Sequence, residues 1–150
     1  MDEVKNGAAV PGTVAFRLGT LGTIATARFA AAVEPLDLKP KHVGVMTALD
    51  LGVAASQQDL ALQLGVAPSL VVALADHLEH LGAIHRDRDP GDRRRQILTL
   101  TDYGRTLLAQ CADLARQVDS QLTAKLSPRQ LDALQDALAI LAADLGLPTA

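Results

Sequence analysis

The sequence predicts a mainly α-helical fold that carries one small β-hairpin. Alanine and leucine dominate the 150 residues, and only two Phe and one Tyr are aromatic, a composition that favours packed helices over sheets. Helix-start and helix-stop signals recur along most of the chain. Residues 84–100 differ, because apolar residues flank a Pro-Gly pair there, which is the pattern of two short strands and a turn.

The first predicted helix covers residues 13–34 and is ended by Pro35. Its apolar positions recur at steps of four and three and form one stripe: Val14, Leu18, Leu21, Ala25 and Phe29. A second helix is expected from Pro40 to about Gly52. Its expected buried residues are Val43, Met46 and Leu49.

Two shorter helices follow, and a tight turn separates them. Ser56 and Asp59 form a capping box that opens the third helix. Gly65 suits a left-handed helix end, and Pro68 suits the first position of the fourth helix. Gly82 ends this fourth helix. Its predicted buried face consists of Val71, Leu74, Leu78 and Leu81.

Residues 84–100 are expected to form two strands joined by a tight turn at Pro90-Gly91. Five of the 14 Lys and Arg residues lie in this hairpin, namely Arg86, Arg88, Arg93, Arg94 and Arg95. The formal net charge of the chain is −3, so the basic charge is local. Arginine on a thin hairpin suits the minor groove of DNA. The alternative is a solvated hairpin whose Asp and Arg residues pair with one another.

Two long helices are predicted at the C-terminal end. Thr101 caps the first of them, and Ser127, Pro128 and Gln130 open the second. The first has the stripe Leu107, Cys111, Leu114, Val118 and Leu122, in which Cys111 is expected to be a buried structural thiol. The second has the heptad seam Leu131, Leu134, Leu138, Leu141 and Leu145. We expect helices from both termini to pack against a second copy of the chain; a closed monomeric bundle is the alternative.

The chain resembles the MarR family of bacterial winged helix-turn-helix regulators from about Leu38 to Leu108. The similar segments are Asp-Leu-Ala-x-x-Leu-Gly-Val at 59–66, Leu-Glu-x-Leu-Gly at 78–82, Arg-x-x-x-Pro-x-Asp-Arg-Arg at 86–94 and Leu-x-Leu-Thr-x-x-Gly-Arg at 98–105. The resemblance implies a homodimer on double-stranded DNA, with the fourth helix in the major groove and the hairpin, or wing, near the minor groove. It also implies that Arg94 meets DNA at the wing tip and that Asp92 orients the turn.

This reading divides the chain into a flexible tail at residues 1–12, dimerisation helices at 13–36 and 101–146, and a winged helix-turn-helix lobe at 37–100. The predicted DNA-binding residues are Ser69, Val72, Ala73, His77, Arg86, Arg88, Asp92, Arg93, Arg94 and Arg95. Val72 and Ala73 depart from the family, whose members usually carry Thr and a basic residue at these positions. Since direct readout of guanine normally needs Arg or Lys, an alternative is a regulator-like module that binds a ligand or protein and has weakened DNA affinity.

The expected function is a cytoplasmic DNA-binding repressor that a small aromatic or phenolic ligand releases. The resemblance suggests Phe16, Arg17, His42 and Met46 for the ligand site. A metal-sensing regulator that uses His77 and His80 is a further alternative, although phosphate contacts are the preferred interpretation of both residues. No nucleophile–base set or phosphate-binding loop is found, so neither an enzyme, a cofactor nor a bound metal is expected. No apolar run approaches the ~18 residues of a membrane span.

Overall fold

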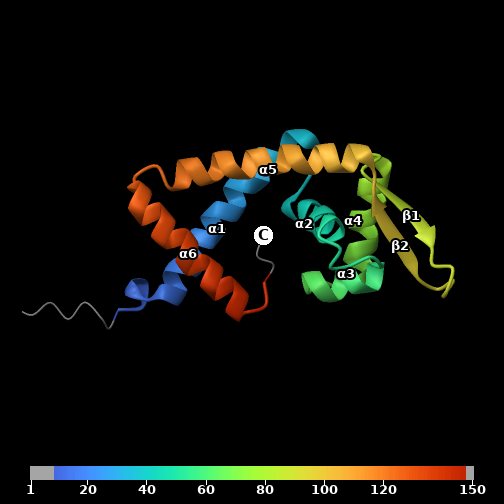
Figure 1. The fold of residues 1–150 in the computed structure, drawn as a ribbon, viewed down its shortest axis with the longest axis horizontal. Coiled ribbons are helices and arrows are strands. Elements are labelled where there is room, and N and C mark those ends of the chain that lie inside the picture. The colour runs from blue at the N-terminus through green and yellow to red at the C-terminus, as the bar shows by residue number, and fades with distance from the viewer. Residues whose placement is uncertain (1–8, 148–150) are drawn as a thin grey trace, which may run out of the picture.

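A long helix, α5 (Asp102–Leu122), runs along one edge of the molecule and joins two lobes (Figure 1). The structure is a computed structural model that describes residues 9–147, so most of the predicted N-terminal tail lies outside the described residues. One lobe contains α1 (Val14–Val33) and α6 (Pro128–Asp144), with short 3-10 turns at Val10–Gly12 and Glu34–Leu36. The other contains α2 (Pro40–Asp50), α3 (Gln57–Leu64), α4 (Pro68–His80), β1 (Ile84–Arg88) and β2 (Gln96–Leu100). This architecture confirms the predicted fold class.

The predicted capping residues set the helix boundaries. The hydroxyl of Ser56 accepts a hydrogen bond from the backbone N–H of Asp59 at 3.0 Å, and Ser127 caps α6 in the same way. Gly65 ends α3 in the left-handed region with φ +63°, a conformation that a residue without Cβ adopts at little cost. No side chain caps α4, as the alanine at position 67 predicts.

The hydrophobic core lies in the winged lobe and against the adjoining part of α5. Met46, Leu60 and Leu78 are its largest fully buried side chains. Cys111 is also buried, and burial raises the pKa of its thiol, which fits the expected structural role. Val43, Leu49 and Leu81 are only partly buried at the edge of this core.

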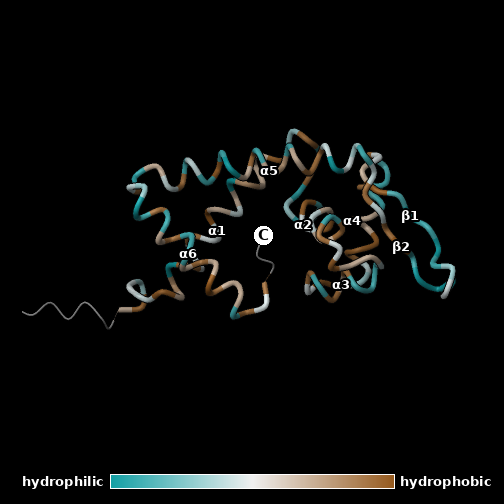
Figure 2. The backbone as a smooth tube through the Cα atoms, in the orientation of Figure 1, coloured by the Kyte–Doolittle hydropathy of each residue, from teal (hydrophilic) through white to brown (hydrophobic). Residues whose placement is uncertain are grey.

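The hairpin differs from the prediction in its loop. The strands are antiparallel, with Arg86 opposite Leu98, but residues 89–95 form a longer connection than a tight turn at Pro90-Gly91. Side-chain hydrogen bonds hold this loop, because Asp89 accepts from the N–H of Gly91 at 2.8 Å and Asp92 from the N–H of Arg94 at 3.0 Å. Figure 2 shows hydrophilic segments on both arms of this loop and a paler segment at its outermost point.

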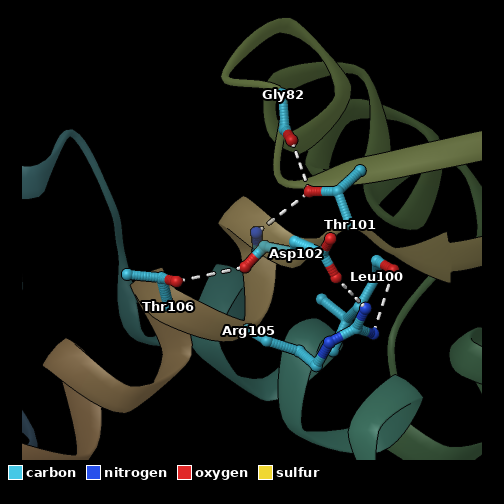
Figure 3. Close-up of polar contacts among 7 residues, drawn as sticks. Gly82, Leu100, Thr101, Asp102, Arg105 and Thr106 are labelled. Carbon is cyan, nitrogen blue, oxygen red and sulfur yellow. Dashed lines mark hydrogen bonds and ion pairs between the residues drawn. The ribbon is translucent and has the colours of Figure 1, made fainter.

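Hydrogen bonds join the end of the winged lobe to the start of α5 (Figure 3). The hydroxyl of Thr101 donates to the carbonyl of Gly82 at 2.6 Å and accepts from the N–H of Gly104 at 2.9 Å. A Cβ atom on Gly104 would lie 2.0 Å from the carbonyl oxygen of Ala83. Only glycine therefore allows α5 to begin this close to the end of the α4–β1 connection.

The two terminal helices contribute little to the core of a single chain. Val33 is the only buried residue of α1, and α6 has none. The exposed apolar side chains of these helices include Val14, Phe16, Leu18, Leu21, Ile24, Leu134, Leu138, Ile140, Leu141 and Leu145. Within residues 9–147, no single helix combines the length and apolar character required to cross a membrane; α3 and α4 meet these criteria only as a pair, which is bent by 114°.

Candidate nucleic-acid interface

Helices α3 and α4 form the helix-turn-helix of the winged lobe. They meet at 114°, within the ~90–120° that is typical of this motif. Helix α4 is anchored in the core by four buried residues, Val71, Leu74, Ala75 and Leu78. The side chains on its other side therefore point outward. The exposed residues of α4 are Pro68, Ser69, Val72, Ala73, Asp76, Glu79 and His80. Leu70 is partly buried against the core.

The charge on α4 is acidic. This helix contains Asp76 and Glu79 but neither Lys nor Arg. Its exposed apolar side chains, Val72 and Ala73, can contact thymine methyl groups, which carry little sequence information. The cations that could face DNA phosphates must therefore come from the neighbouring wing.

Three wing arginines point into solvent. Arg88 ends β1, and Arg93 and Arg94 lie in the loop, where all three side chains are exposed. None of them belongs to an ion pair with another residue of the described range 9–147. These three arginines therefore do not fit the alternative in which Asp residues of the hairpin neutralise its arginines.

The other two wing arginines have partners inside the lobe. Arg86 pairs with the carboxylates of Asp76, at 2.6 Å, and Glu79, at 3.0 Å. Arg95 donates to the hydroxyl of Ser56 at 3.2 Å and pairs with Asp59 at 3.3 Å. These contacts connect the base of the wing to α4 and to the capping box of α3.

The hydrogen bond from Ser56, more than any charge, lowers the pKa of Asp59, with a smaller contribution from Arg95. For Glu79, the hydrogen bond from Arg86 is the main cause of a lowered pKa. Both carboxylates are thus held in the ionised form that accepts from the two arginines.

His77 is turned toward the lobe rather than toward solvent, unlike our expectation for the outer face of α4. Its Nε2 bonds to the backbone carbonyl of Asp37 at 2.6 Å, and its ring stacks on that of His42. His80 is exposed. No group of three or more His, Cys, Asp or Glu residues in the described chain is arranged to hold a metal ion, so the geometry gives no support to the metal-sensing alternative.

A crevice of about 830 Å³ lies where the end of α1 meets α2 and α4. Its polar lining comes from Glu34, Asp37, Lys39, His42 and His77. Asp37 has a left-handed backbone with φ +58°, which Asp tolerates better than most residues. The crevice therefore touches both the linker that follows α1 and helix α4.

The four residues predicted for a ligand site do not come together in one subunit. His42 lines the crevice, but Met46 is fully buried in the core, and Phe16 and Arg17 lie in the exposed first turn of α1. Sequence reasoning missed Asp37 and Lys39. The available signal was a pair of charged residues in the short linker between two predicted helices, directly before Pro40.

Comparison with known proteins gives consistent matches. A family model described as MarR family matches residues 44–95. A putative transcriptional regulatory protein for the hcr operon of Thauera aromatica is 32% identical over 123 residues, which are 79% of this chain and 74% of the relative.

Two solved structures extend the match to nearly the whole chain. The transcriptional repressor CouR bound to a 23-mer DNA duplex has 34% identity and a TM-score of 0.75, with 94% of this chain and 99% of that chain covered. The Mycobacterium tuberculosis MarR family protein Rv2887 in complex with salicylic acid has 25% identity and a TM-score of 0.71, with 86% and 96% covered. The helix-turn-helix, the arginine-bearing wing and these similarities together place the chain in the MarR family of transcriptional regulators.

Proposed function

We propose that this chain is a homodimeric repressor that binds double-stranded DNA through α4 and the wing and releases it when a small ligand binds. The observation that carries DNA binding is the set of three exposed wing arginines, Arg88, Arg93 and Arg94, beside the helix-turn-helix. They form a local basic tip on a chain of net charge −3. CouR, a repressor by name, has been solved with a DNA duplex, which supports the same role here.

The docking follows from shape and charge. A helix fits the major groove, and a thin hairpin fits the minor groove, where the potential is most negative. Because α4 carries no cation, we expect affinity to depend on the wing, on backbone contacts and on groove shape more than on base readout. Ser69 is the side chain of α4 best suited to bond a phosphate or a base edge.

The exposed stripes of α1 and α6 support dimerisation. Leu138 and Leu141 are 42% and 43% exposed, and Ile140 is 69% exposed. Exposed apolar side chains in this number along a helix face mark an interaction site. A two-fold dimer would bury it and would present two α4 helices to successive turns of the major groove.

The crevice beside His42 supports ligand control. Its volume of about 830 Å³ suits a small molecule, and Lys39 offers a cation for a carboxylate. Rv2887 has been solved with salicylic acid. A ligand that separates the linker from α4 would favour an arrangement with lower DNA affinity.

The test is DNA binding measured by fluorescence anisotropy on the duplex that flanks the protein's own gene, at several salt concentrations and with salicylate as the probe. We expect affinity to fall with salt, salicylate to weaken binding, and DNA to weaken salicylate binding by the same factor. The acidic α4 favours one alternative, a ligand- or protein-binding module with weakened DNA affinity. Salicylate binding without DNA binding at low salt would support that alternative.

A further inference from the structure

Arg86 connects three elements of the winged lobe. Ile84, Arg86 and Arg88 share one face of β1, since every second side chain of a strand points the same way. Their exposure rises along the strand from buried Ile84 to exposed Arg88. Between them, the guanidinium of Arg86 lies against α4, and its side chain is only 20% exposed.

The contacts of Arg86 engage both ends of its guanidinium. Nη2 lies 2.6 Å from Oδ1 of Asp76 and 3.0 Å from Oε1 of Glu79. Nη1 donates to Oε1 of Gln57, in α3, at 3.3 Å. A planar fork of fixed donors is held in one orientation by such a set of acceptors.

These two carboxylates are the charged side chains of a recognition helix that has no Lys or Arg. They lie three residues apart, so they project from neighbouring positions on one side of α4. Without a cation beside them they would repel the phosphates of a duplex that receives α4. Arg86 supplies that cation from the wing.

We propose that Arg86 is a positioning residue that neutralises Asp76 and Glu79 and fixes the wing against α4, and that it is not a direct DNA contact. This inference rests on the proposed DNA-binding function and replaces the DNA contact that the sequence predicted for Arg86. Arg88, two residues further along the same strand face, keeps the role of a DNA-facing cation.

The experiment compares four full-length proteins: the wild type, Arg86→Gln, Asp76→Asn/Glu79→Gln, and the triple variant. Binding to a random-sequence DNA duplex is measured at several salt concentrations. We expect Arg86→Gln to weaken binding about tenfold or more at low salt and less at high salt, because the uncovered carboxylates repel the phosphates and salt screens that repulsion. The triple variant should recover most of the lost affinity and the salt slope of the wild type, since the uncovered carboxylates are gone, and should fall short only by the lost connection between the wing and α4.

Arg88→Gln is the matched control. It should lower the salt slope by about one unit, and the substitutions at Asp76 and Glu79 should not restore the slope. A triple variant as weak as Arg86→Gln, with the slope also lowered by about one, would show that Arg86 binds a phosphate and would overturn the inference.

The thermal unfolding of the same four proteins tests the inference without DNA. Arg86→Gln should lower the midpoint by leaving two carboxylates without their cation, and the triple variant should recover part of the loss. Additive changes would show that the three residues are not coupled and would also overturn the inference. A wild type that does not bind the duplex would overturn the proposed function, while the unfolding cycle would still decide the role of Arg86.

Discussion

The imidazole ring of His77, in the recognition helix, stacks on the ring of His42, at the start of α2, with centroids 4.5 Å apart and planes inclined by 29°. Nδ1 of His42 accepts the N–H of Lys39 at 2.9 Å, and His77 bonds to the carbonyl of Asp37. Two stacked rings thus tie the linker that follows α1 to the helix proposed to enter the major groove. A movement of this linker should therefore either shift α4 together with the stacked rings or separate the two rings.

The His42 pair predicts a pH dependence of stability. Burial, with smaller contributions from His77 and Lys39, lowers the pKa of His42 to about 4. The unfolded chain takes up this proton near pH 6.5 and the folded chain near pH 4, so the free energy of unfolding should fall as the pH drops through that window. The loss should reach at most about 3 kcal/mol.

His42→Asn tests this assignment, because its side-chain oxygen can still accept the N–H of Lys39 but does not titrate. Urea unfolding at a series of pH values should show a shallower decline for this variant than for the wild type between pH 6.5 and 4. Asp59 and Glu79, whose pKa values are lowered, also lose stabilisation as the pH falls, but they do so in both proteins. Parallel curves for the two proteins would remove His42 as the cause.

The terminal helices predict an oligomeric state that a single substitution can change. Leu141→Glu would place a charge in the apolar face of α6 and should convert a dimer to a monomer or an aggregate at micromolar concentration, as should deletion of residues 127–150. Sedimentation velocity measures this directly. Leu62→Glu is the control, since Leu62 in α3 is 84% exposed and lies outside α1 and α6. A well-folded monomer for the unaltered chain would contradict the assembly.

The exposed wing arginines predict two different losses. Arg94→Ala should weaken specific DNA binding by about 1–3 kcal/mol if Arg94 reads the groove, and Arg93→Ala should lower the salt slope by about one unit if it contacts a phosphate. Arg95→Ala serves as the comparison. Its guanidinium is engaged by Ser56 and Asp59, so it should lower thermal stability more than the salt slope. Unchanged DNA binding for both Arg93→Ala and Arg94→Ala would exclude the wing tip from DNA recognition.

The close approach of α5 to Ala83 predicts a steric effect at Gly104. Gly104→Ala would bring a methyl group within 2.0 Å of the Ala83 carbonyl oxygen, so α5 would have to shift, at a cost of at least about 2 kcal/mol of unfolding free energy. Gly44→Ala is the matched control in a helix of the same lobe. There the new Cβ meets only Leu64, at 3.4 Å, and better helix propensity should add up to about 1 kcal/mol. Equal chemical denaturation midpoints for the two variants would contradict this packing argument.

The sequence predicted those parts of the fold that local chemistry determines. Ser56, Thr101 and Ser127 mark helix starts because their hydroxyls satisfy backbone N–H groups three residues ahead. The segment Thr101-x-x-Gly104, which is part of the family pattern, forms a cap followed by a close helix approach.

The sequence could not predict features that depend on distant contacts. Arg86 and Arg95 turn inward because α4 and the cap of α3 lie beside the wing. These neighbours are distant in the sequence, so the orientation of the two side chains could not be predicted from it. Arg17 lies in the first turn of α1 and His42 in the first turn of α2, beyond the other end of a helix that is about 30 Å long for its 20 residues. A pattern read along the chain does not show that they lie at different ends of this helix.

The apolar recognition helix predicts shallow base discrimination in the major groove. Val72 is 40% exposed and Ala73 is exposed beside it, so base substitutions under α4 should cost less than the usual ~1–3 kcal/mol each. Changes that widen an A·T-rich minor groove under the wing should cost more. A binding panel of single-base variants of the target duplex, measured at one salt concentration, tests both statements. A steep preference under α4 with indifference under the wing would contradict them.

The same surface predicts a gain of affinity from one added cation. Ala73→Arg introduces a charge that can reach a phosphate without displacing a buried group, so it should tighten binding to random-sequence DNA and raise the salt slope by about one unit. Ala109→Arg makes the same change in net charge at an exposed position of α5, a helix outside the helix-turn-helix and the wing. If the effect arises from contact with DNA, only the substitution at Ala73 should change the slope. An equal increase for both variants would show that net charge alone accounts for the gain, and α4 would not be the helix that faces DNA.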